Sequence, residues 1–188
     1  MFTFKEVQSE KLLQESFRFR YKMIQDSKNP FSLINAEELD IDEYDKYSKH
    51  FVALDKDNKI IATFRLIIDS PMGYPTPNKM SINMLDDKKN SKDYCEASRI
   101  FIEPKYRGIK NTKKIINTFM DMSIPYIKEK NVKYMYAALE KNFLKLLHIF
   151  DLNYQIIGEA SEYHGIRYPC LLTRDVFIKD NPLFLKKL

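Results

Sequence analysis

A short acidic segment is the first candidate for chemistry. Asp40, Asp42 and Asp45 alternate with apolar and aromatic residues, and Ser48 and His50 follow them at the start of an apolar run. Such a cluster on a loop is often only solvated. A calcium loop of the EF-hand type would need a glycine at its sixth position and a glutamate at its twelfth, and neither is present. The carboxylates are therefore available for ion pairing or for binding a ligand.

Other charged residues interrupt runs that are otherwise typical of core strands. Arg65 lies within the apolar run 62–67, and Glu96 and Arg99 lie within the run 94–102. Strict alternation would place Glu96 and Ser98 on one face of that strand, and Arg99 on the other with Phe101. Because buried charges are tolerated when they are paired, we expect ion pairs. A lattice of pairs that only fixes the fold is the alternative. The candidate partners are Asp40, Asp42, Asp45 and Glu96 on the acidic side, and Arg20, Arg65 and Arg99 on the basic side.

The elements that must position these residues follow from hydrophobic periodicity. Residues 2–7 alternate as a strand does, and Ser9 can cap a helix that continues to about Asp26. Residues 70–93 predict a loop, and loops of that length are uncommon unless they serve a function. We expect strands at 50–54 and 59–68 joined by a turn at 55–58, a strand at 94–102, a helix from about Gly108, a strand at 132–138, a helix at 141–150, and strands at 154–157 and 168–174.

The bulk properties are those of a soluble globular protein. The chain has 188 residues and a formal net charge of +5, which suits one domain over residues 1–188. No run of five basic residues occurs, so we expect no nucleic-acid partner. The N-terminus does not resemble a signal peptide, and no apolar run approaches the ~20 residues of a membrane span. We expect no membrane insertion, a cytoplasmic protein, and two buried reduced thiols at Cys95 and Cys170.

The order of elements predicts a mixed α/β (α+β) fold. The motifs resemble those of the acyl-homoserine-lactone (autoinducer) synthases, which read Arg-x-x-Val-Phe, Glu-x-Asp-x-Tyr-Asp, an arginine in the strand after the hairpin, and Glu-x-Ser-Arg-Phe. The segment from Asp42 to Leu66 is similar to the N-acyl amino acid synthases as well. The matching positions are Arg20 to Ile24, Asp40 to Asp45, Phe64 to Leu66, and Glu96 to Phe101.

That resemblance implies the GNAT acyl-CoA N-acyltransferase fold, a mostly antiparallel twisted sheet flanked by helices. It also implies transfer of an acyl group from a thioester to an amine. Glu96 would take the proton of the amine, and backbone N–H groups around Arg99 to Ile102 would hold the oxyanion. The resemblance further implies that Arg99 and Asp45 belong to the catalytic set. The implied substrate-binding residues are Arg20, Asp42, Arg65, Ser98 and Phe101.

The sequence departs from the lactone synthases at several positions. Asp40 stands where they have a glutamate, and Ile24 replaces a phenylalanine. The chain contains no tryptophan, whereas the synthases place one after the first helix, near Phe31 here. These departures put a pocket for S-adenosylmethionine in doubt. They favour, slightly, an amino-acid-like amine as the acceptor.

The start of the helix after residue 102 bears on the acyl donor. Acetyl-CoA enzymes of this fold place a glycine-rich loop here, whose N–H groups hold a pyrophosphate. In this chain Lys110 stands where the second glycine is expected. The basic residues are then either a solvated helix start or a docking patch for an acidic acyl carrier protein. The implied donor-binding residues are Ile102, Arg107, Gly108, Lys110, Lys113 and Lys114, with Lys105 beside them.

The sequence therefore predicts an N-acyltransferase with no permanently bound cofactor and no metal. Its donor substrate would be acyl carrier protein or CoA carrying an acyl group. Its acceptor would be an amino acid or S-adenosylmethionine, and its product an N-acyl amino acid or an acyl-homoserine lactone. The alternatives are a CoA-dependent GNAT acetyltransferase acting on another amine, and an inert domain that binds an acylated ligand.

Overall fold

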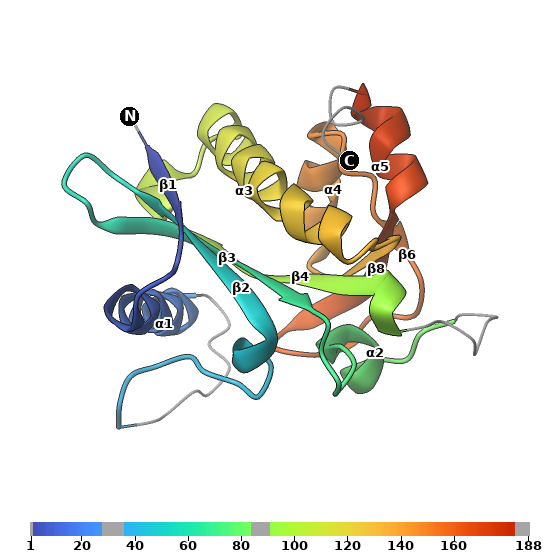
Figure 1. Ribbon diagram of the computed structural model, residues 1–188, viewed down its shortest axis with the longest axis horizontal. Helices are drawn as coiled ribbons and strands as arrows, with labels where there is room; N and C mark the ends of the chain where they lie inside the picture. Colours follow the sequence, from blue (N-terminus) through green and yellow to red (C-terminus); the bar gives the residue numbers. More distant parts are fainter. Residues whose placement is uncertain (1, 28–35, 84–90, 183–188) are drawn as a thin grey trace. The chain divides into compact units, whose positions relative to one another are not determined.

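The computed structural model describes residues 2–27, 36–83 and 91–182 (Figure 1). The chain divides into two compact units. The first comprises residues 1–66 and 98–122, and the second residues 67–97 and 123–188. Whether they act as the single domain expected from the length stays a prediction.

The described strands form a mixed sheet flanked by helices, as predicted for the fold class. Three elements cross from one unit to the other: β3, β4 and α3. The strands are β1 (Thr3–Glu6), β2 (Ser48–Leu54), β3 (Ile60–Ile68), β4 (Tyr94–Ile102), β5 (Tyr134–Leu139), β6 (Gln155–Ile156), β7 (Ser161–Glu162) and β8 (Ile166–Thr173). The α-helices are α1 (Glu10–Gln25), α2 (Pro75–Lys79), α3 (Ile109–Glu129), α4 (Lys141–Ile149) and α5 (Arg174–Asp180), and the 3₁₀ turns are η1 (Asp45–Tyr47), η2 (Ser91–Asp93) and η3 (Pro104–Tyr106).

In the first unit, two helices cover opposite faces of neighbouring strands. β1 pairs antiparallel with β2, and β2, β3 and β4 follow in that order. On one face the ring of Phe17 in α1 packs edge-on against His50 of β2, with 5.6 Å between ring centroids. On the other face Phe64 of β3 stacks between Phe51 of β2 and Phe119 of α3, at 5.8 and 5.7 Å. His50 and Phe51 are neighbours in one strand, so their side chains face opposite helices. Figure 1 shows α1 on one side of these strands and α3 on the other.

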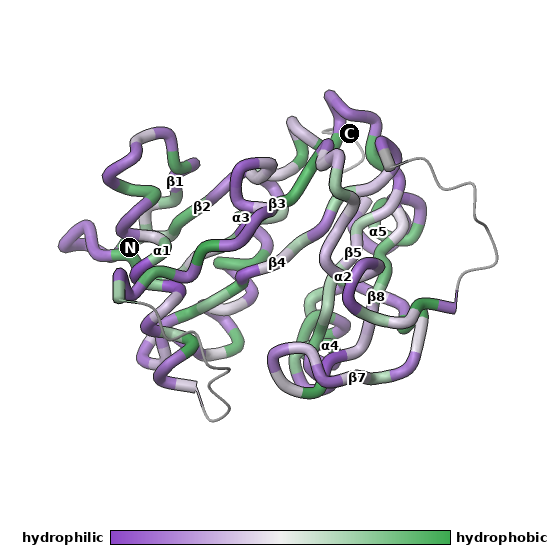
Figure 2. Tube along the Cα trace, turned by 90° about the horizontal axis from the view of Figure 1, so that it is seen from below, coloured by the Kyte–Doolittle hydropathy of each residue, from purple (hydrophilic) through white to green (hydrophobic). Residues whose placement is uncertain are grey.

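Local signals account for the bounds of α1. The side chain of Ser9 accepts a hydrogen bond from the N–H of Leu12 and caps the helix, as the sequence predicted. Hydrophobic and hydrophilic residues both occur along α1 and α3 (Figure 2), which suits helices that bury one side. In α1 the buried set includes Phe17, Met23 and Ile24, and it also includes one charged residue, Arg20.

The second unit contains the first half of β4 together with β5, β8, β6 and β7. β4 runs parallel to β5, with Tyr94 opposite Tyr134 and Glu96 opposite Tyr136. β8 pairs antiparallel with β5, and β6 and β7 each pair antiparallel with β8. The thiols of Cys95 and Cys170 are buried and free, as predicted, and burial raises the pKa of both. Along the described chain, no helix combines the length and the apolar content that a membrane span requires.

Apart from the 3₁₀ turns, three elements of the described residues were not predicted. Residues 70–93 were expected to be loop throughout, but α2 forms at Pro75–Lys79, where a proline in the first turn favours helix entry. The last strand was expected to reach Arg174. It ends at Thr173, whose side chain accepts a hydrogen bond from the N–H of Val176 and so begins α5. β7 has only two residues, too few to give a periodic pattern.

Candidate active site

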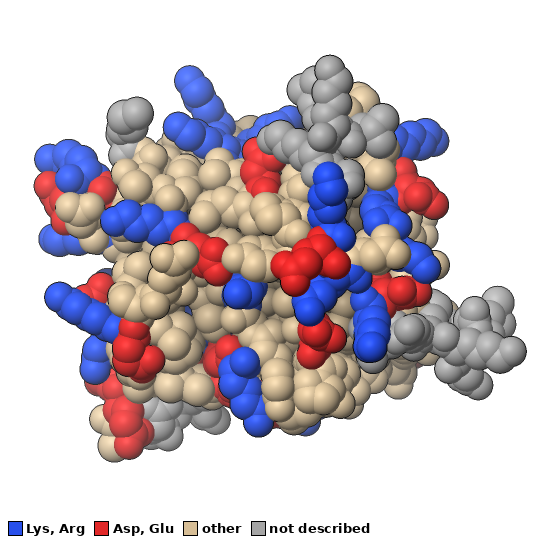
Figure 3. All heavy atoms as spheres, in the orientation of Figure 1, with Lys and Arg blue, Asp and Glu red and all other residues tan. Residues whose placement is uncertain are grey.

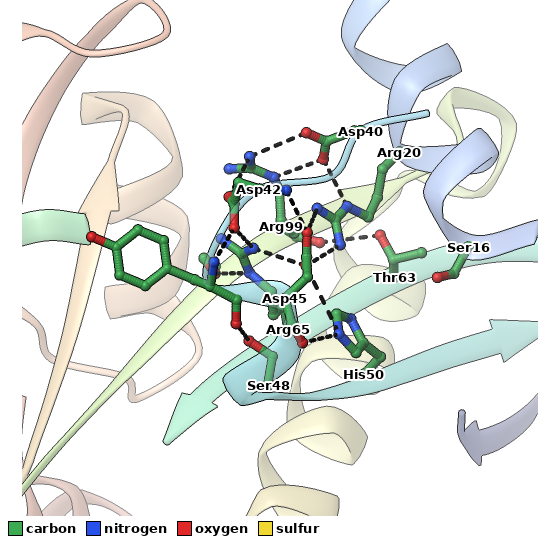
Figure 4. A network of polar contacts seen from close by, with 12 residues as sticks. Ser16, Arg20, Asp40, Asp42, Asp45, Ser48, His50, Thr63, Arg65 and Arg99 are labelled. Atoms are coloured by element: carbon green, nitrogen blue, oxygen red, sulfur yellow. Dashed lines mark hydrogen bonds and ion pairs between the residues drawn. The ribbon is translucent and has the colours of Figure 1, made fainter. Parts of the chain in front are cut away.

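Six charged side chains of the first unit form one ion-pair network (Figure 4). Three are arginines and three are aspartates, so their formal charges cancel. They come from α1, from the segment before β2, and from β3 and β4, and most are buried. The members are Arg20, Asp40, Asp42, Asp45, Arg65 and Arg99.

Arg20 connects α1 to the acidic segment. Its Nε lies 2.7 Å from Oδ2 of Asp40, and its Nη1 lies 2.9 Å from Oδ1 of Asp45. The backbone N–H of Asp40 also donates to the carbonyl of Phe17 at 3.2 Å. The predicted pairing of the acidic segment with Arg20 is confirmed. The segment is not a merely solvated cluster, since Asp40 is buried.

Arg65 lies in β3, and its side chain is at the centre of the network. Its Nη1 donates to Asp42 at 2.6 Å and to Asp45 at 2.9 Å, and its Nε donates to the hydroxyl of Ser98 at 2.9 Å. Arg65 alternates with Phe64, so it faces α1 while Phe64 faces α3. The strand interior therefore tolerates this arginine because all these partners lie on one face.

The strict alternation predicted for the side chains of β4 is wrong at Arg99. Its backbone has φ of 52°, in the left-handed region that residues with a Cβ seldom adopt. Its Nε and Nη2 bind Asp40 at 2.7 and 3.1 Å, and Nη2 binds Asp42 at 3.0 Å. Strict alternation placed Ser98 and Arg99 on opposite faces. Both side chains instead reach the same network, because the left-handed residue interrupts the pleat.

The electrostatics of the network keep Asp40 and Asp45 ionised. Burial raises the pKa of Asp45, but the guanidinium groups of Arg20 and Arg65 lower it more, and the pKa ends well below its ordinary value. Burial likewise raises the pKa of Asp40, and Arg99 and Arg20 lower it to a value below the ordinary one. The pKa of Arg65 is raised: burial opposes the charge, while Asp45 and Asp42 favour it.

Exposure divides the network into a buried part and a reachable part. The side chains of Arg20, Arg65 and Asp40 are 1% exposed, whereas Asp42 is 22% exposed and Arg99 is 12% exposed. The contacts of Arg99 use Nε and Nη2, so among the described residues its Nη1 takes no part in the network. Asp42 and Arg99 are therefore the members that a ligand can reach.

Residues around the network hold the acidic segment in shape. The N–H of Asp42 donates to Asp45, and the N–H of Tyr44 donates to Asp42. The hydroxyl of Ser48 donates to the carbonyl of Tyr44 at 2.7 Å. His50 lies 3.2 Å from the carbonyl of Asp45, and burial lowers its pKa although the Asp45 carboxylate opposes that shift. His50 is thus held neutral beside the network.

Glu96 lies in the second unit and is buried. Its Oε2 accepts a hydrogen bond of 2.9 Å from the N–H of Thr76 in the first turn of α2. The hydroxyl of Tyr74, just before that helix, donates to the carbonyl of Tyr94. No sequence signal indicated α2, so this support for Glu96 was missed. The predicted pairing of Glu96 with an arginine stays a prediction.

The predicted donor residues lie around the start of α3. Nε of Arg107 donates to the carbonyl of Ile102 at 2.8 Å, and the hydroxyl of Tyr106 donates to Asp55 of the β2–β3 turn at 3.0 Å. A Cβ placed on Gly108 would meet nothing within 4 Å, so the space beside this residue is open, while its N–H donates to the hydroxyl of Thr112 at 3.4 Å. Lys105, Lys110 and Lys114 are exposed, and Lys113 is half-buried.

Basic side chains project beside the beginning of α3 in the upper left of Figure 3. Elsewhere on that face the two signs of charge are interspersed.

Two other predicted residues are Phe101 and Phe31. Phe101 is half-buried in β4, and Phe31 lies outside the described residues. The roles assigned to all of these side chains stay predictions.

Thr63 of β3 was missed by the sequence reasoning. It is buried, and its hydroxyl donates to the carbonyl of Arg99 at 3.1 Å (Figure 4). The available signal was its place two residues before Arg65, which puts both side chains on one face of the strand. A hydroxyl on that face of an apolar strand indicates a polar partner on a neighbouring strand.

Comparison with known proteins extends these findings. The family model for the acetyltransferase (GNAT) domain matches residues 19–117. No curated protein sequence matches the chain.

Several solved structures resemble this one. FeeM, an N-acyl amino acid synthase from uncultured soil microbes, aligns with a TM-score of 0.71 at 12% identity, over 99% of this chain and 98% of that chain. The AHL synthase LasI aligns with a TM-score of 0.69 at 16% identity, over 92% and 88%. The CoA-dependent acyl-homoserine lactone synthase BjaI, solved with MTA, aligns with a TM-score of 0.69 at 15% identity, over 97% and 89%. At such identities the likeness is one of fold.

Proposed function

The chain belongs to the GNAT acetyltransferase family, and we propose that it transfers an acyl group from a thioester to the amine of an amino-acid-like acceptor. The product would be an N-acyl amino acid or, with S-adenosylmethionine as acceptor, an acyl-homoserine lactone. The family match supports N-acyl transfer, and the resemblance in fold to synthases of both products supports the narrower proposal.

The observation that carries the proposal is the exposure pattern of the ion-pair network. Asp42 and Arg99 are of opposite charge, partly exposed, and 3.0 Å apart. A zwitterionic amino acid carries one positive and one negative group close together, and these complement Asp42 and Arg99. Its ammonium group would pair with Asp42, and its carboxylate would pair with Nη1 of Arg99. Arg65, Arg20 and Asp45 would hold these two residues in place rather than touch the ligand, since their side chains are almost wholly buried.

The reaction requires a neutral amine, because an ammonium nitrogen has no free electron pair. Glu96 is itself buried, so it would accept a proton from the amine through a water molecule. The nitrogen would then attack the thioester carbonyl carbon, and N–H groups of β4 near Arg99 would stabilise the oxyanion. Collapse of this intermediate would break the carbon–sulfur bond. The nitrogen would lose its second proton to the departing thiolate, and the first proton, held by Glu96, would pass to solvent. No external oxidant or cofactor is needed.

The donor would bind at the start of α3. The open space beside Gly108 suits a phosphate group, and the exposed lysines beside it suit an acidic acyl carrier protein. CoA is the second candidate donor, because the similar structure of BjaI is described as CoA-dependent. A phosphopantetheine carries one phosphate where CoA carries more, so the lysine in place of the second glycine favours the carrier protein.

Two measurements test the proposal. The first is thiol release by the purified protein from acyl carrier protein and from CoA, each loaded with short, medium and long acyl chains, in the presence of amino acids or S-adenosylmethionine. The second is mass spectrometry of lipid extracts from cells that express the chain, with Glu96→Gln as the matched inactive control. An acylated amine that appears only with the unaltered chain is expected. Absence of thiol release with every donor would refute the proposal.

The acceptor is tested separately by calorimetry. S-adenosylmethionine carries a bulky adenine, and the chain has no tryptophan to form a wall against it. We therefore expect an amino acid to bind and S-adenosylmethionine to bind weakly, both measured with the acyl donor present. Micromolar binding of S-adenosylmethionine that is lost in Asp42→Asn would establish the lactone synthase instead.

A further inference from the structure

One peptide of β4, the peptide that joins Arg99 to Ile100, is held from two sides. The side chain of Arg99 is anchored to Asp40 and Asp42. The carbonyl of Arg99 accepts a hydrogen bond from the buried hydroxyl of Thr63 on the neighbouring strand β3. Arg99 is left-handed, with φ of 52°, so this peptide is turned out of the regular pleat.

The planarity of the peptide bond transmits this restraint. The carbonyl of Arg99 and the N–H of Ile100 belong to one rigid trans unit and point in opposite directions. A hydrogen bond that fixes the carbonyl toward β3 therefore fixes the N–H of Ile100 away from β3. The paired residues of β4 and β5 run from Tyr94 to Glu96, and Ile100 lies beyond the last of these pairs. A hydrogen bond to the carbonyl also polarises the peptide and strengthens its N–H as a donor.

We propose that Thr63 is a positioning residue of the acyl transfer, whose hydroxyl holds the Arg99–Ile100 peptide so that the N–H of Ile100 points at the oxygen of the thioester carbonyl. This inference rests on the proposed function and adds a residue that the motifs did not include. Thr63 does not touch the substrate. It acts through the peptide that it holds, and the Arg99 side chain restrains the same peptide from the other end.

The hydroxyl and the shape of Thr63 can be separated by substitution. Thr63→Val keeps the branched shape and removes the donor, whereas Thr63→Ser keeps the donor. Thr118→Val is the matched control, because Thr118 also donates to a carbonyl, that of Lys114 at 2.8 Å, but on the exposed side of α3. The assay is thiol release from acyl carrier protein or CoA loaded with the preferred acyl chain.

Thr63→Val should lower kcat by about 10-fold to 100-fold with little change in KM for the donor, because an oxyanion contact acts in the transition state. Thr63→Ser and Thr118→Val should stay within about threefold of the unaltered protein. Equal turnover of the Val and Ser variants would overturn the inference, and so would a Val effect confined to KM. If the Val variant fails to fold, Thr63→Ala takes its place and is judged by the same criteria.

A measurement without substrate checks the same restraint. The amide resonance of Ile100 in ¹⁵N–¹H spectra should move in Thr63→Val and stay near its original position in Thr63→Ser and Thr118→Val. An unmoved resonance in Thr63→Val would overturn the claim that the hydroxyl holds this peptide. A moved resonance, in a protein that releases no thiol from any donor, would place the failure in the proposed function instead.

Discussion

Asp45→Asn is the substitution that the ion-pair network makes most informative. The carboxylate of Asp45 contacts Arg20 at 2.9 Å, Arg65 at 2.9 Å and the N–H of Asp42 at 2.8 Å. Asparagine has nearly the same shape but no charge, and its amide group would bring N–H donors toward the two guanidinium groups. The network would then hold three buried or half-buried positive charges against two negative ones.

The expected cost follows from that imbalance. Removing one partner of a buried ion pair typically costs about 3–5 kcal/mol, because the remaining charge is left without compensation. Domains have about 5–15 kcal/mol of stability in total. For a chain of this size, each kcal/mol lowers Tm by about 2–4 °C, so the loss corresponds to about 6–20 °C.

Urea unfolding at neutral pH measures this cost as a shift in midpoint at constant slope. Asp57→Asn is the control, because Asp57 is exposed and pairs with Lys56 only at 3.8 Å, and it should change the free energy of unfolding by about 0.5 kcal/mol or less. Adding Arg20→Met to Asp45→Asn restores the balance of charge, so the double variant should lose less than the sum of the single losses. A loss below about 1 kcal/mol for Asp45→Asn would refute the view that these charges depend on one another.

The other predictions concern catalysis, the donor and pH. Glu96→Gln should lower kcat about 100-fold or more in the thiol-release assay and leave Tm nearly unchanged; unaltered turnover would remove Glu96 from the mechanism. Changing Lys110, Lys113 and Lys114 to Glu should raise KM for acyl carrier protein, by less at high salt, and hardly alter KM for acyl-CoA; equal losses with both donors would indicate a CoA phosphate site instead. Burial lowers the pKa of His50, so protonation favours the unfolded chain, and stability should fall as the pH drops below about 6.5. His50→Gln should flatten the decline in urea midpoint between about pH 7 and pH 5, and an equally steep decline would exclude His50 as its source.

The parts of the fold that the sequence predicted are those determined by local signals. Ser9 caps α1 by accepting a hydrogen bond from the N–H of Leu12, three residues along the chain. The turn at 55–58 is closed by two hydrogen bonds, from the N–H of Asp55 to the carbonyl of Lys59 and from the N–H of Lys59 to the carboxylate of Asp55. β4 has the predicted bounds because a proline follows soon after its end. α2 and β7 have five and two residues, too few for periodicity to stand out from chance.

The ion pairs between the acidic segment and the three arginines were predicted, but their geometry was not. Unlike charges in apolar strands must find partners, so the pairing of the acidic segment with Arg20, Arg65 and Arg99 could be foreseen. Which residues stay reachable could not be foreseen, because the exposure of Asp42 and Arg99 depends on how the segment before β2 lies over β3 and β4. The hydrogen bond from Thr63 to Arg99 joins residues 36 positions apart and leaves no local trace.

The left-handed backbone of Arg99 explains why the protein keeps six charged side chains in the ion-pair network. Apolar residues in their place would cost less free energy to bury. Replacing buried ion pairs with apolar residues is often neutral or stabilising, so stability alone does not explain the network. A left-handed residue with a Cβ persists only where its surroundings over-determine it. Asp40 and Asp42 hold the Arg99 side chain, and Thr63 holds its carbonyl. An apolar residue at position 99 would lack the ion pairs with Asp40 and Asp42, so we expect the strand to return to regular alternation there. We therefore infer that the ion-pair network serves to hold the irregular backbone of β4 at Arg99. This strand also carries Glu96 and the proposed oxyanion donor.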